Sequence, residues 1–227
     1  FDDLFRGVRY EPGDVAVDVD CGTGRWTREL SRRGLRACGF DVAPTMVSRA
    51  QELAPRILFT VASAACLPVA SASQQVATSV TVLHHLPPEE QSAAVAELAR
   101  VLRPGGWCLA VVLLDSLPSG RWCYPRNQSV WLELFRDHGL RAVRWRREEF
   151  LTPAILLQWF ARGLAATLGR SHARGERPGV VARYGGKLYQ GLHRLSVGAS
   201  YPLEAAAATW FPNAPSTGLA ALFVKEP

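Results

Sequence analysis

The chain has 227 residues, of which 48% are hydrophobic and 20% are charged, and its formal net charge is +6. This length corresponds to one domain, or to one domain with an insertion, and the apolar fraction excludes an intrinsically disordered chain. The sequence contains no run of about 18 uncharged apolar residues, so we expect no transmembrane helix.

The basic residues are almost all arginines, since Lys187 and Lys225 are the only lysines. Such a bias can reflect coding composition, so the net charge alone does not indicate a nucleic-acid-binding protein. The five cysteines are scattered without the spacing of a metal site, and the N-terminal residues lack the pattern of a secretory signal. We therefore expect reduced thiols, a cytoplasmic location and no bound metal.

The first element in chain order is a short apolar run at residues 15–19 that ends in an acidic, glycine-containing loop. A helical pattern follows Gly24, which predicts a strand, a tight turn and a helix N-terminus. Small ligands bind at this edge of parallel α/β sheets. The glycines let a ligand approach the backbone closely, and the first helical turn offers free N–H donors. This segment therefore predicts a ligand-binding loop.

Further strands are predicted at residues 37–41, 57–61 and 76–82. A helix opens after the first of these, with Pro44 suited to its first turn. Asp41 ends the same strand, and a carboxylate there can accept hydrogen bonds from both ribose hydroxyls of an adenosine. The predicted ligand edge is thus suited to a nucleoside.

The second half of the chain continues the alternation, with helices predicted at about 89–102 and 129–138 and strands at 107–114, 140–146 and 219–224. Before the last strand, about residues 152–210 form a predicted helical insert. It begins with Thr152 and Pro153, an N-cap followed by proline at the first helical position. Its apolar residues pack on the sheet, cover an active site or form a surface contact, and the sequence leaves all three open.

Five motifs follow one another in the first half of the chain: Asp18–Gly24, Asp41, Ser63–Pro68, Leu83–Leu86 and Arg100–Gly106. In order and spacing they resemble the class I S-adenosylmethionine-dependent methyltransferases of the type 11, small-molecule group. The resemblance covers about residues 14–114, the cofactor-binding core. It implies a single α/β domain over residues 1–227, with a Rossmann-like, seven-stranded, mostly parallel sheet, an antiparallel terminal hairpin, helices on both faces and the helical insert before the last strand.

The resemblance also implies which residues bind the cofactor, S-adenosyl-L-methionine. Asp18 would anchor the methionyl amino group, directly or through water, and Asp41 would bind the ribose. The full expected set is Asp18, Asp20, Cys21, Gly22, Thr23, Gly24, Asp41, Val42, Met46, Ser63, Ala64 and Ser79.

Two histidines, His84 and His85, follow the fourth predicted strand and so lie at the ligand edge. Methyl transfer mainly requires donor and acceptor to lie in line with water excluded, and a general base helps when the acceptor is a hydroxyl. The ordinary pKa of imidazole suits that task near neutral pH. We therefore expect His84 and His85 as catalytic candidates, the alternative being that one of them packs or caps the turn before Pro87.

Three positions depart from the family pattern. Asp20 stands where the family has the first loop glycine, Ser63 where it has an aspartate that contacts the adenine, and Gln74-Gln75 where it has Phe-Asp. In this fold the backbone at Asp20 runs beside the methionyl part of the cofactor. A carboxylate there would crowd the cofactor and repel its carboxylate, or would attract its sulfonium or amino group, and the sequence leaves the sign open.

The expected function is methyl transfer to a small, partly apolar acceptor, through a hydroxyl or carboxyl oxygen. One alternative is a tRNA-modifying methyltransferase, for which the arginine clusters 141–147 and 170–183 are the support. Another is a degenerate methyltransferase-like binding module, which Asp20 and Ser63 support. The absence of Asn-Pro-Pro-Tyr argues against methylation of a base amino group, and Thr27 in place of a third glycine argues against a dehydrogenase. The acceptor and the oligomeric state stay open.

Overall fold

The computed structural model describes residues 5–115, 123–150 and 216–227. By its contacts the chain divides into two compact units, Phe1–Arg146 with Gly218–Pro227, and Arg147–Thr217. The second unit and the helical insert predicted at 152–210 lie almost wholly outside the described residues. The organisation of the whole chain as a single domain stays a prediction.

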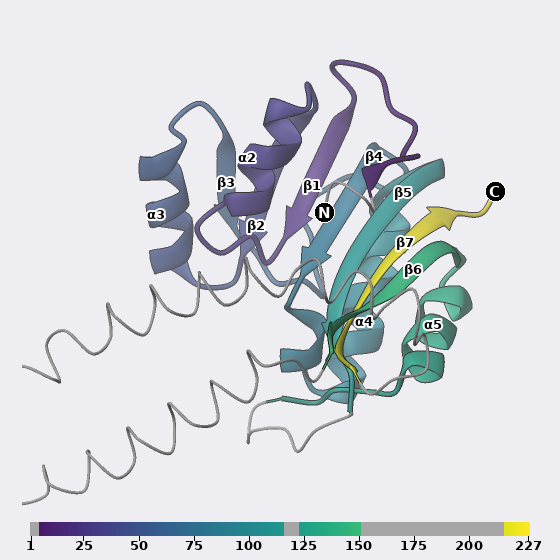
Figure 1. Cartoon of the computed structure of the whole chain (residues 1–227). Helices are drawn as coiled ribbons and strands as arrows, with labels where there is room; N and C mark the ends of the chain where they lie inside the picture. The colour runs from purple at the N-terminus through teal and green to yellow at the C-terminus, as the bar shows by residue number, and fades with distance from the viewer. Residues whose placement is uncertain (1–4, 116–122, 151–215) are drawn as a thin grey trace, which may run out of the picture. The chain divides into compact units, whose positions relative to one another are not determined.

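Seven strands form one sheet in the order β3-β2-β1-β4-β5-β7-β6 (Figure 1). Strands β1 to β5 pair in parallel, and β7 runs antiparallel to β5. The expected fold class, a mostly parallel α/β sheet with an antiparallel terminal strand, is confirmed. The strand bounds are β1 Val15–Val19, β2 Arg36–Asp41, β3 Leu58–Val61, β4 Gln74–Val80, β5 Leu102–Leu113, β6 Leu140–Phe150 and β7 Ser216–Lys225.

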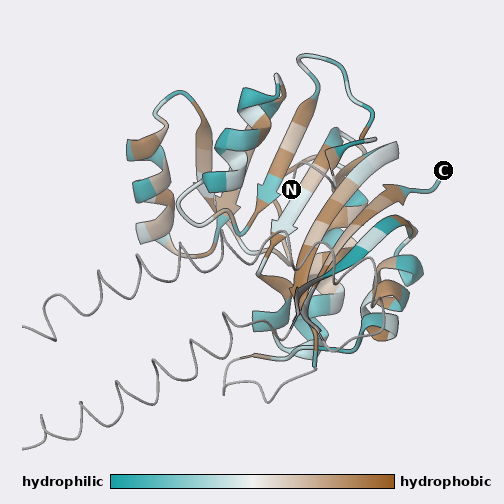
Figure 2. Ribbon diagram, in the orientation of Figure 1, coloured by the Kyte–Doolittle hydropathy of each residue, from teal (hydrophilic) through white to brown (hydrophobic). Residues whose placement is uncertain are grey.

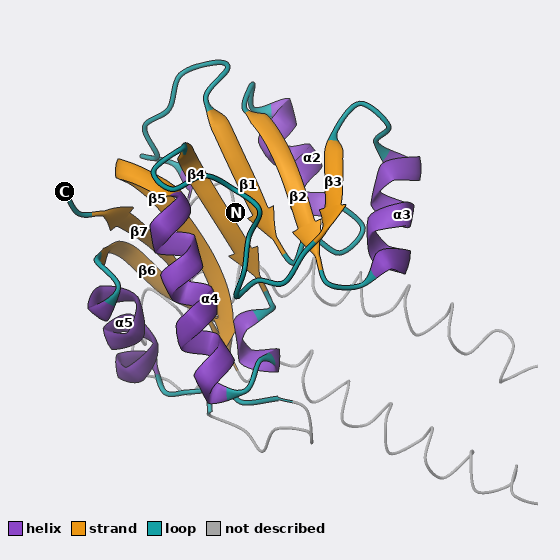
Figure 3. Ribbon diagram, turned by 180° about the vertical axis from the view of Figure 1, so that it is seen from behind, coloured by secondary structure: helices purple, strands orange, loops and turns teal. Residues whose placement is uncertain are grey.

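Helices cover both faces of this sheet. Among the described residues they are α2 Arg25–Arg32, α3 Pro44–Leu53, α4 Pro88–Val101 and α5 Gln128–Asp137, with one 3-10 turn, η1 Leu83–His85. Figure 3 shows α4 and α5 over one face, with α2 behind the sheet and α3 beside β3. Among the described residues, no helix is long and apolar enough to cross a membrane.

The core lies in two layers because successive strand residues point to opposite faces. Ala77 of β4 packs with Leu98 of α4 and Phe135 of α5 in one layer. The neighbouring Val76 packs with Leu30 of α2 in the other. Figure 2 shows this as largely hydrophobic strands flanked by helices that carry hydrophilic residues. Because both faces of the sheet are packed in this way, the ends of β1, β2 and β4 are held by a buried core.

Several predicted strand boundaries differ from the structure. Strand β6 continues to Phe150 rather than to about residue 146, and β7 begins at Ser216 rather than at residue 219. Strand β4 ends at Val80 rather than at residue 82, because Thr81 adopts a left-handed backbone with φ 62° and η1 follows. Strand β5 begins at Leu102, directly after α4, rather than at Trp107. The pairing register of β4 with β5 shifts between Gln74 and Val76, which accommodates this irregular start.

Phe59 of β3 connects this sheet to the first loop. It pairs with Gly39 of β2, and a Cβ at Gly39 would lie 2.7 Å from its Cδ1 and 2.8 Å from the Cys21 sulfur. A Cβ at Gly24, where φ is +75°, would lie 2.6 Å from the ring at Cζ. Both glycines therefore leave the space that the Phe59 ring fills, and the ring fixes the loop against β2 and β3.

Replacing Gly39 with alanine tests this packing. Because the added methyl meets the ring and the sulfur, we expect the free energy of unfolding to fall by about 1–3 kcal/mol. Urea denaturation measures the change. Combining Gly39→Ala with Phe59→Leu should cost less than the sum of the two single changes. Additive costs would show that the ring does not occupy this space.

Candidate functional site

The loop between β1 and α2 turns sharply through residues with left-handed backbone. Asp20 has φ 54°, Gly22 φ 54° and Gly24 φ 75°. The Cys21 N–H donates to the Phe40 carbonyl at 2.8 Å, which ties the loop to the end of β2. The conformation therefore follows from glycines at two positions, whereas Asp20 adopts it with a side chain present.

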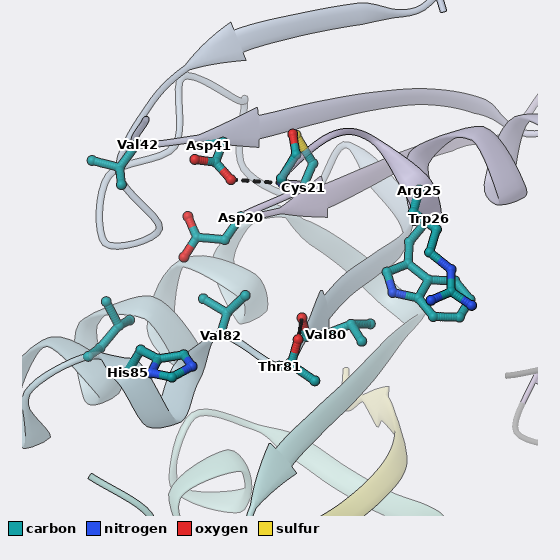
Figure 4. A pocket seen from close by; sticks show the side chains of 12 residues that line it. Asp20, Cys21, Arg25, Trp26, Asp41, Val42, Val80, Thr81, Val82 and His85 are labelled. Atoms are coloured by element: carbon teal, nitrogen blue, oxygen red, sulfur yellow. Dashed lines mark hydrogen bonds between the residues drawn. The ribbon is translucent and has the colours of Figure 1, made fainter. Parts of the chain in front are cut away.

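Asp41, at the end of β2, braces this loop from the other side. One carboxylate oxygen accepts a hydrogen bond from the Gly22 N–H at 2.8 Å, and the other accepts one from the Ala43 N–H at 2.9 Å (Figure 4). Each oxygen of an ionised carboxylate has two acceptor sites, so each keeps one for a further donor. Asp41 thus fixes the loop and the entry to α3 and can still accept from a ligand.

Asp18 lies below the loop and is 1% exposed. Its two oxygens accept hydrogen bonds from the Thr27 and Thr78 hydroxyls, both at 2.7 Å. Burial raises the pKa of this carboxyl to about 6, against the lowering effect of the two hydroxyls. Asp18 therefore joins β1 to α2 and β4 and contacts no solvent-filled space.

A cavity of about 430 Å³ opens at the carboxyl ends of β1, β2 and β4, and its volume is typical of a small-molecule site. Figure 4 shows its lining from the first loop, the start of α2, the end of β2 and the segment that follows β4. The lining residues are Asp20, Cys21, Gly22, Arg25, Trp26, Asp41, Val42, Val80, Thr81, Val82, His85 and Leu86.

The two histidines of η1 have different surroundings. His84 is 1% exposed, and its Nδ1 accepts a hydrogen bond from the Leu113 N–H at 3.2 Å. Burial, and then the neighbouring His85, lower the pKa of His84 to about 4, so it is neutral at physiological pH. His85 is exposed and lines the cavity. A ligand in the cavity can therefore meet His85, whereas His84 packs against β5.

His84, His85 and Cys123 bring their ligand-type atoms within 4.8 Å of one another. Because His84 Nδ1 accepts from the backbone, the proton of its neutral ring resides on Nε2. A metal ion could bind Nε2 only if Nε2 lost this proton while Nδ1 kept its hydrogen bond to the Leu113 N–H. The cluster therefore does not offer a ready set of three lone pairs.

Comparison with known proteins identifies the domain. A family model described as a methyltransferase domain matches residues 16–106, the segment that contains β1 to the start of β5 and most of the cavity. Over residues 16–106 the chain therefore matches a methyltransferase domain. The resemblance to class I methyltransferases noted in the sequence is thereby confirmed, and this class uses S-adenosyl-L-methionine.

Three curated relatives show how far this likeness extends. A malonyl-[acyl-carrier protein] O-methyltransferase of Hahella chejuensis is 36% identical over 49% of this chain and 45% of its own length. A 2-methyl-6-phytyl-1,4-hydroquinone methyltransferase of Synechocystis is 30% identical over 69% of this chain and 46% of its own. A tRNA (carboxymethyluridine(34)-5-O)-methyltransferase of Mus musculus is 34% identical over 44% of this chain and 15% of its own length. The chain thus spans less than half of each of these relatives.

Among solved structures, the [4+2]-cyclase SpnF superimposes with a TM-score of 0.65, at 20% identity over 99% of this chain and 79% of that one. This likeness concerns the fold. A protein named as a cyclase on this fold illustrates that the reaction has to be argued from the site.

Six of the residues expected in the methyltransferase site line the cavity: Asp20, Cys21, Gly22, Asp41, Val42 and His85. The others lie around it. Buried and outside the lining are Asp18, Gly24, Ala64, Ser79 and His84, and exposed are Thr23, Met46 and Ser63. The Ser63 hydroxyl accepts from the Ala65 N–H at 3.2 Å, and the buried Ser79 hydroxyl has no hydrogen-bond partner among the described residues. The assignment of these residues to the cofactor stays a prediction.

Sequence reasoning missed half of the cavity wall of the methyltransferase domain. The missed residues flank the predicted motifs: Arg25, Trp26, Val80, Thr81, Val82 and Leu86. Their adjacency to the glycine loop and to the histidine pair was the available signal. The left-handed turn at Thr81, which redirects the chain after β4, has no sequence signal because threonine rarely adopts it.

Asp20 adds an unusual charge to this wall. Among the described residues its carboxylate has no hydrogen-bond partner, and burial, then the charges of Asp41 and Asp18, raise its pKa to about 6. Between about pH 4 and pH 6 the folded chain binds a proton that the unfolded chain has released. Asp20 therefore lowers the stability of the methyltransferase domain as the pH rises through this window.

Asp20→Asn should stabilise the protein more at pH 7.5 than at pH 4.5, by about 1–2 kcal/mol, because it removes an ionisation that burial disfavours. Urea denaturation at the two pH values measures this difference. Asp137→Asn is the matched control, because this aspartate is 68% exposed and lies outside the cavity. An equal effect of Asp20→Asn at both pH values would contradict the raised pKa.

Proposed function

We propose that this chain binds S-adenosyl-L-methionine in the described cavity and transfers its methyl group to an oxygen atom of a small, partly apolar acceptor. The observation that carries the proposal is one cavity in which the Asp41-braced glycine loop faces His85. The loop and Asp41 supply donors and acceptors for a nucleoside, and His85 supplies a base.

The bound cofactor would supply an electrophilic methyl group on a sulfonium. The residues of the chain would orient the reactants and move one proton. Asp41 would accept hydrogen bonds from the ribose with its free acceptor sites, and the Val80–Val82 segment would exclude water from the acceptor side. His85 would take the proton of the acceptor hydroxyl.

The acceptor class follows from the lining and from the relatives. Val42, Val80, Val82 and Leu86 give the cavity an apolar share. One relative is named as a malonyl-[acyl-carrier protein] O-methyltransferase, and another is named for a 2-methyl-6-phytyl-1,4-hydroquinone, which joins a polar ring to an apolar chain. The wall and the phytyl hydroquinone support a partly apolar acceptor, and the name of the malonyl relative supports transfer to an oxygen.

The tRNA-modifying alternative has a named relative but weaker support in the described surface. Within the arginine cluster 141–147, Arg141 lies 3.3 Å from the Glu226 carboxylate, and Arg144 donates to the Arg6 carbonyl at 3.0 Å. These arginines are engaged within the protein, which reduces what they offer to phosphates. The cluster at 170–183 lies outside the described residues.

Calorimetric titration with S-adenosyl-L-methionine and with S-adenosylhomocysteine tests the proposal. We expect binding of at least one of them with a dissociation constant in the micromolar range, about −8 kcal/mol. The absence of heat for both ligands up to millimolar concentration would instead favour a degenerate binding module. Salt-sensitive binding of tRNA by the same sample would favour the tRNA-modifying alternative.

Substitutions of the two histidines should have different effects, one on kcat and the other on the melting temperature. His85→Gln should lower kcat for the acceptor found in a methyl-transfer screen by about 10²–10⁴-fold and leave the melting temperature unchanged, because it removes a base at the cavity surface. His84→Ala should lower the melting temperature, because it empties a buried site and leaves the Leu113 N–H without its acceptor. Loss of kcat with intact stability in His84→Ala would reverse these roles.

A further inference from the structure

Two carboxylates line the cavity, Asp20 and Asp41, and a third, Asp18, is buried below the loop; the three have unequal surroundings. Asp18 accepts from two hydroxyls, and Asp41 accepts from two backbone N–H groups. Asp20, which directly follows β1, has no such donor among the described residues. Of the three, Asp20 therefore carries the anionic charge that is least neutralised by the protein.

The side chain of Asp20 enters the cavity. Figure 4 shows its carboxylate extending from the end of β1 into the space between Asp41 and the Val82 side of the wall. The backbone there is left-handed with φ 54°, a conformation that glycine would adopt without cost. Non-glycine residues in this strained conformation occur mainly at functional sites, and here the strained residue presents a charged group to the cavity.

Arg25, the arginine of the same wall, leaves this charge uncompensated. The guanidinium of Arg25 lies 4.6 Å from the centre of the Trp26 ring, over which it stacks, and Arg25 forms no ion pair with Asp20. His85, across the cavity, is the other basic residue in the lining. At neutral pH the pKa of about 6 still leaves the Asp20 carboxyl ionised, so the loop end presents a negative charge to a ligand.

From this arrangement we infer that Asp20 is a specificity-determining residue: its carboxylate favours the cationic sulfonium form of the cofactor over the neutral thioether product. The inference rests on the proposed function. The two ligands share adenosine, amino and carboxylate groups and differ by the methyl and its positive charge. A fixed anion in a partly desolvated cavity acts on that difference, whereas contacts to the shared groups cancel.

This selectivity would have a catalytic consequence. A product that lacks the positive charge loses the attraction of Asp20 as soon as the methyl has left, so its release is favoured over that of the cofactor. The effect concerns product release and not the transfer step itself, because only interactions that are stronger in the transition state than in the ground state accelerate the chemistry.

Calorimetric titration of the full chain with S-adenosyl-L-methionine and S-adenosylhomocysteine, at one pH and one salt concentration, gives the ratio of the two dissociation constants. The variants are Asp20→Asn, which removes the charge and keeps the size, and Asp20→Gly, which removes both. Asp137→Asn makes the same change of charge at a 68% exposed position outside the cavity and is the control. Thermal melts establish that each variant is folded.

We expect Asp20→Asn and Asp20→Gly to weaken the preference for the sulfonium about tenfold relative to the unaltered chain, and Asp137→Asn to leave it unchanged. A ratio that stays constant in Asp20→Asn would overturn the inference, even if both affinities change together. Binding by Asp20→Gly but not by the unaltered chain would also overturn it, since Asp20 would then close the site. If neither ligand binds to any folded variant, the proposed function fails and the inference fails with it.

Discussion

The hydrogen bond from the Gly22 N–H to Asp41 is the constraint on which the candidate site depends. It joins two strand ends that are adjacent in the sheet and 19 residues apart in the chain. The same carboxylate receives the Ala43 N–H, so one side chain sets the first loop and the start of α3 together. The cavity is the space that these two segments leave at the edge of a rigid sheet.

Below this bond, the Asp18 carboxylate has a purely structural role, whereas the Asp41 carboxylate also faces the cavity. Its burial at 1% exposure is costly, and two threonine hydroxyls offset part of that cost. A buried carboxylate that joins β1, α2 and β4 makes the base of the loop rigid. The division of work among three aspartates, one structural, one bracing and one facing the cavity, comes from their partners and not from their chemistry.

The sequence was sufficient to predict, through the family resemblance, a mostly parallel sheet, and to predict the edge at which the cavity lies, because parallel strands place their carboxyl ends together. It was insufficient to separate His84 from His85. Which of two adjacent histidines turns inward depends on a contact with Leu113, 29 residues further along the chain. The turn at Thr81 was missed for a related reason. Its N–H donates to the Val111 carbonyl of β5, which is distant in the chain, and its left-handed backbone contradicts the local preference of threonine.

The ring of Phe59 gives the glycines beside it a structural role. Because Gly24 and Gly39 make room for that ring, they are required by the interior of the protein whether or not a cofactor ever reaches the loop. A descendant of this chain that lost its chemistry would still be selected to keep them. The spacing of these glycines therefore follows from the packing of the interior, and the chemistry of the site depends on the side chains that enter the cavity, among them Asp20.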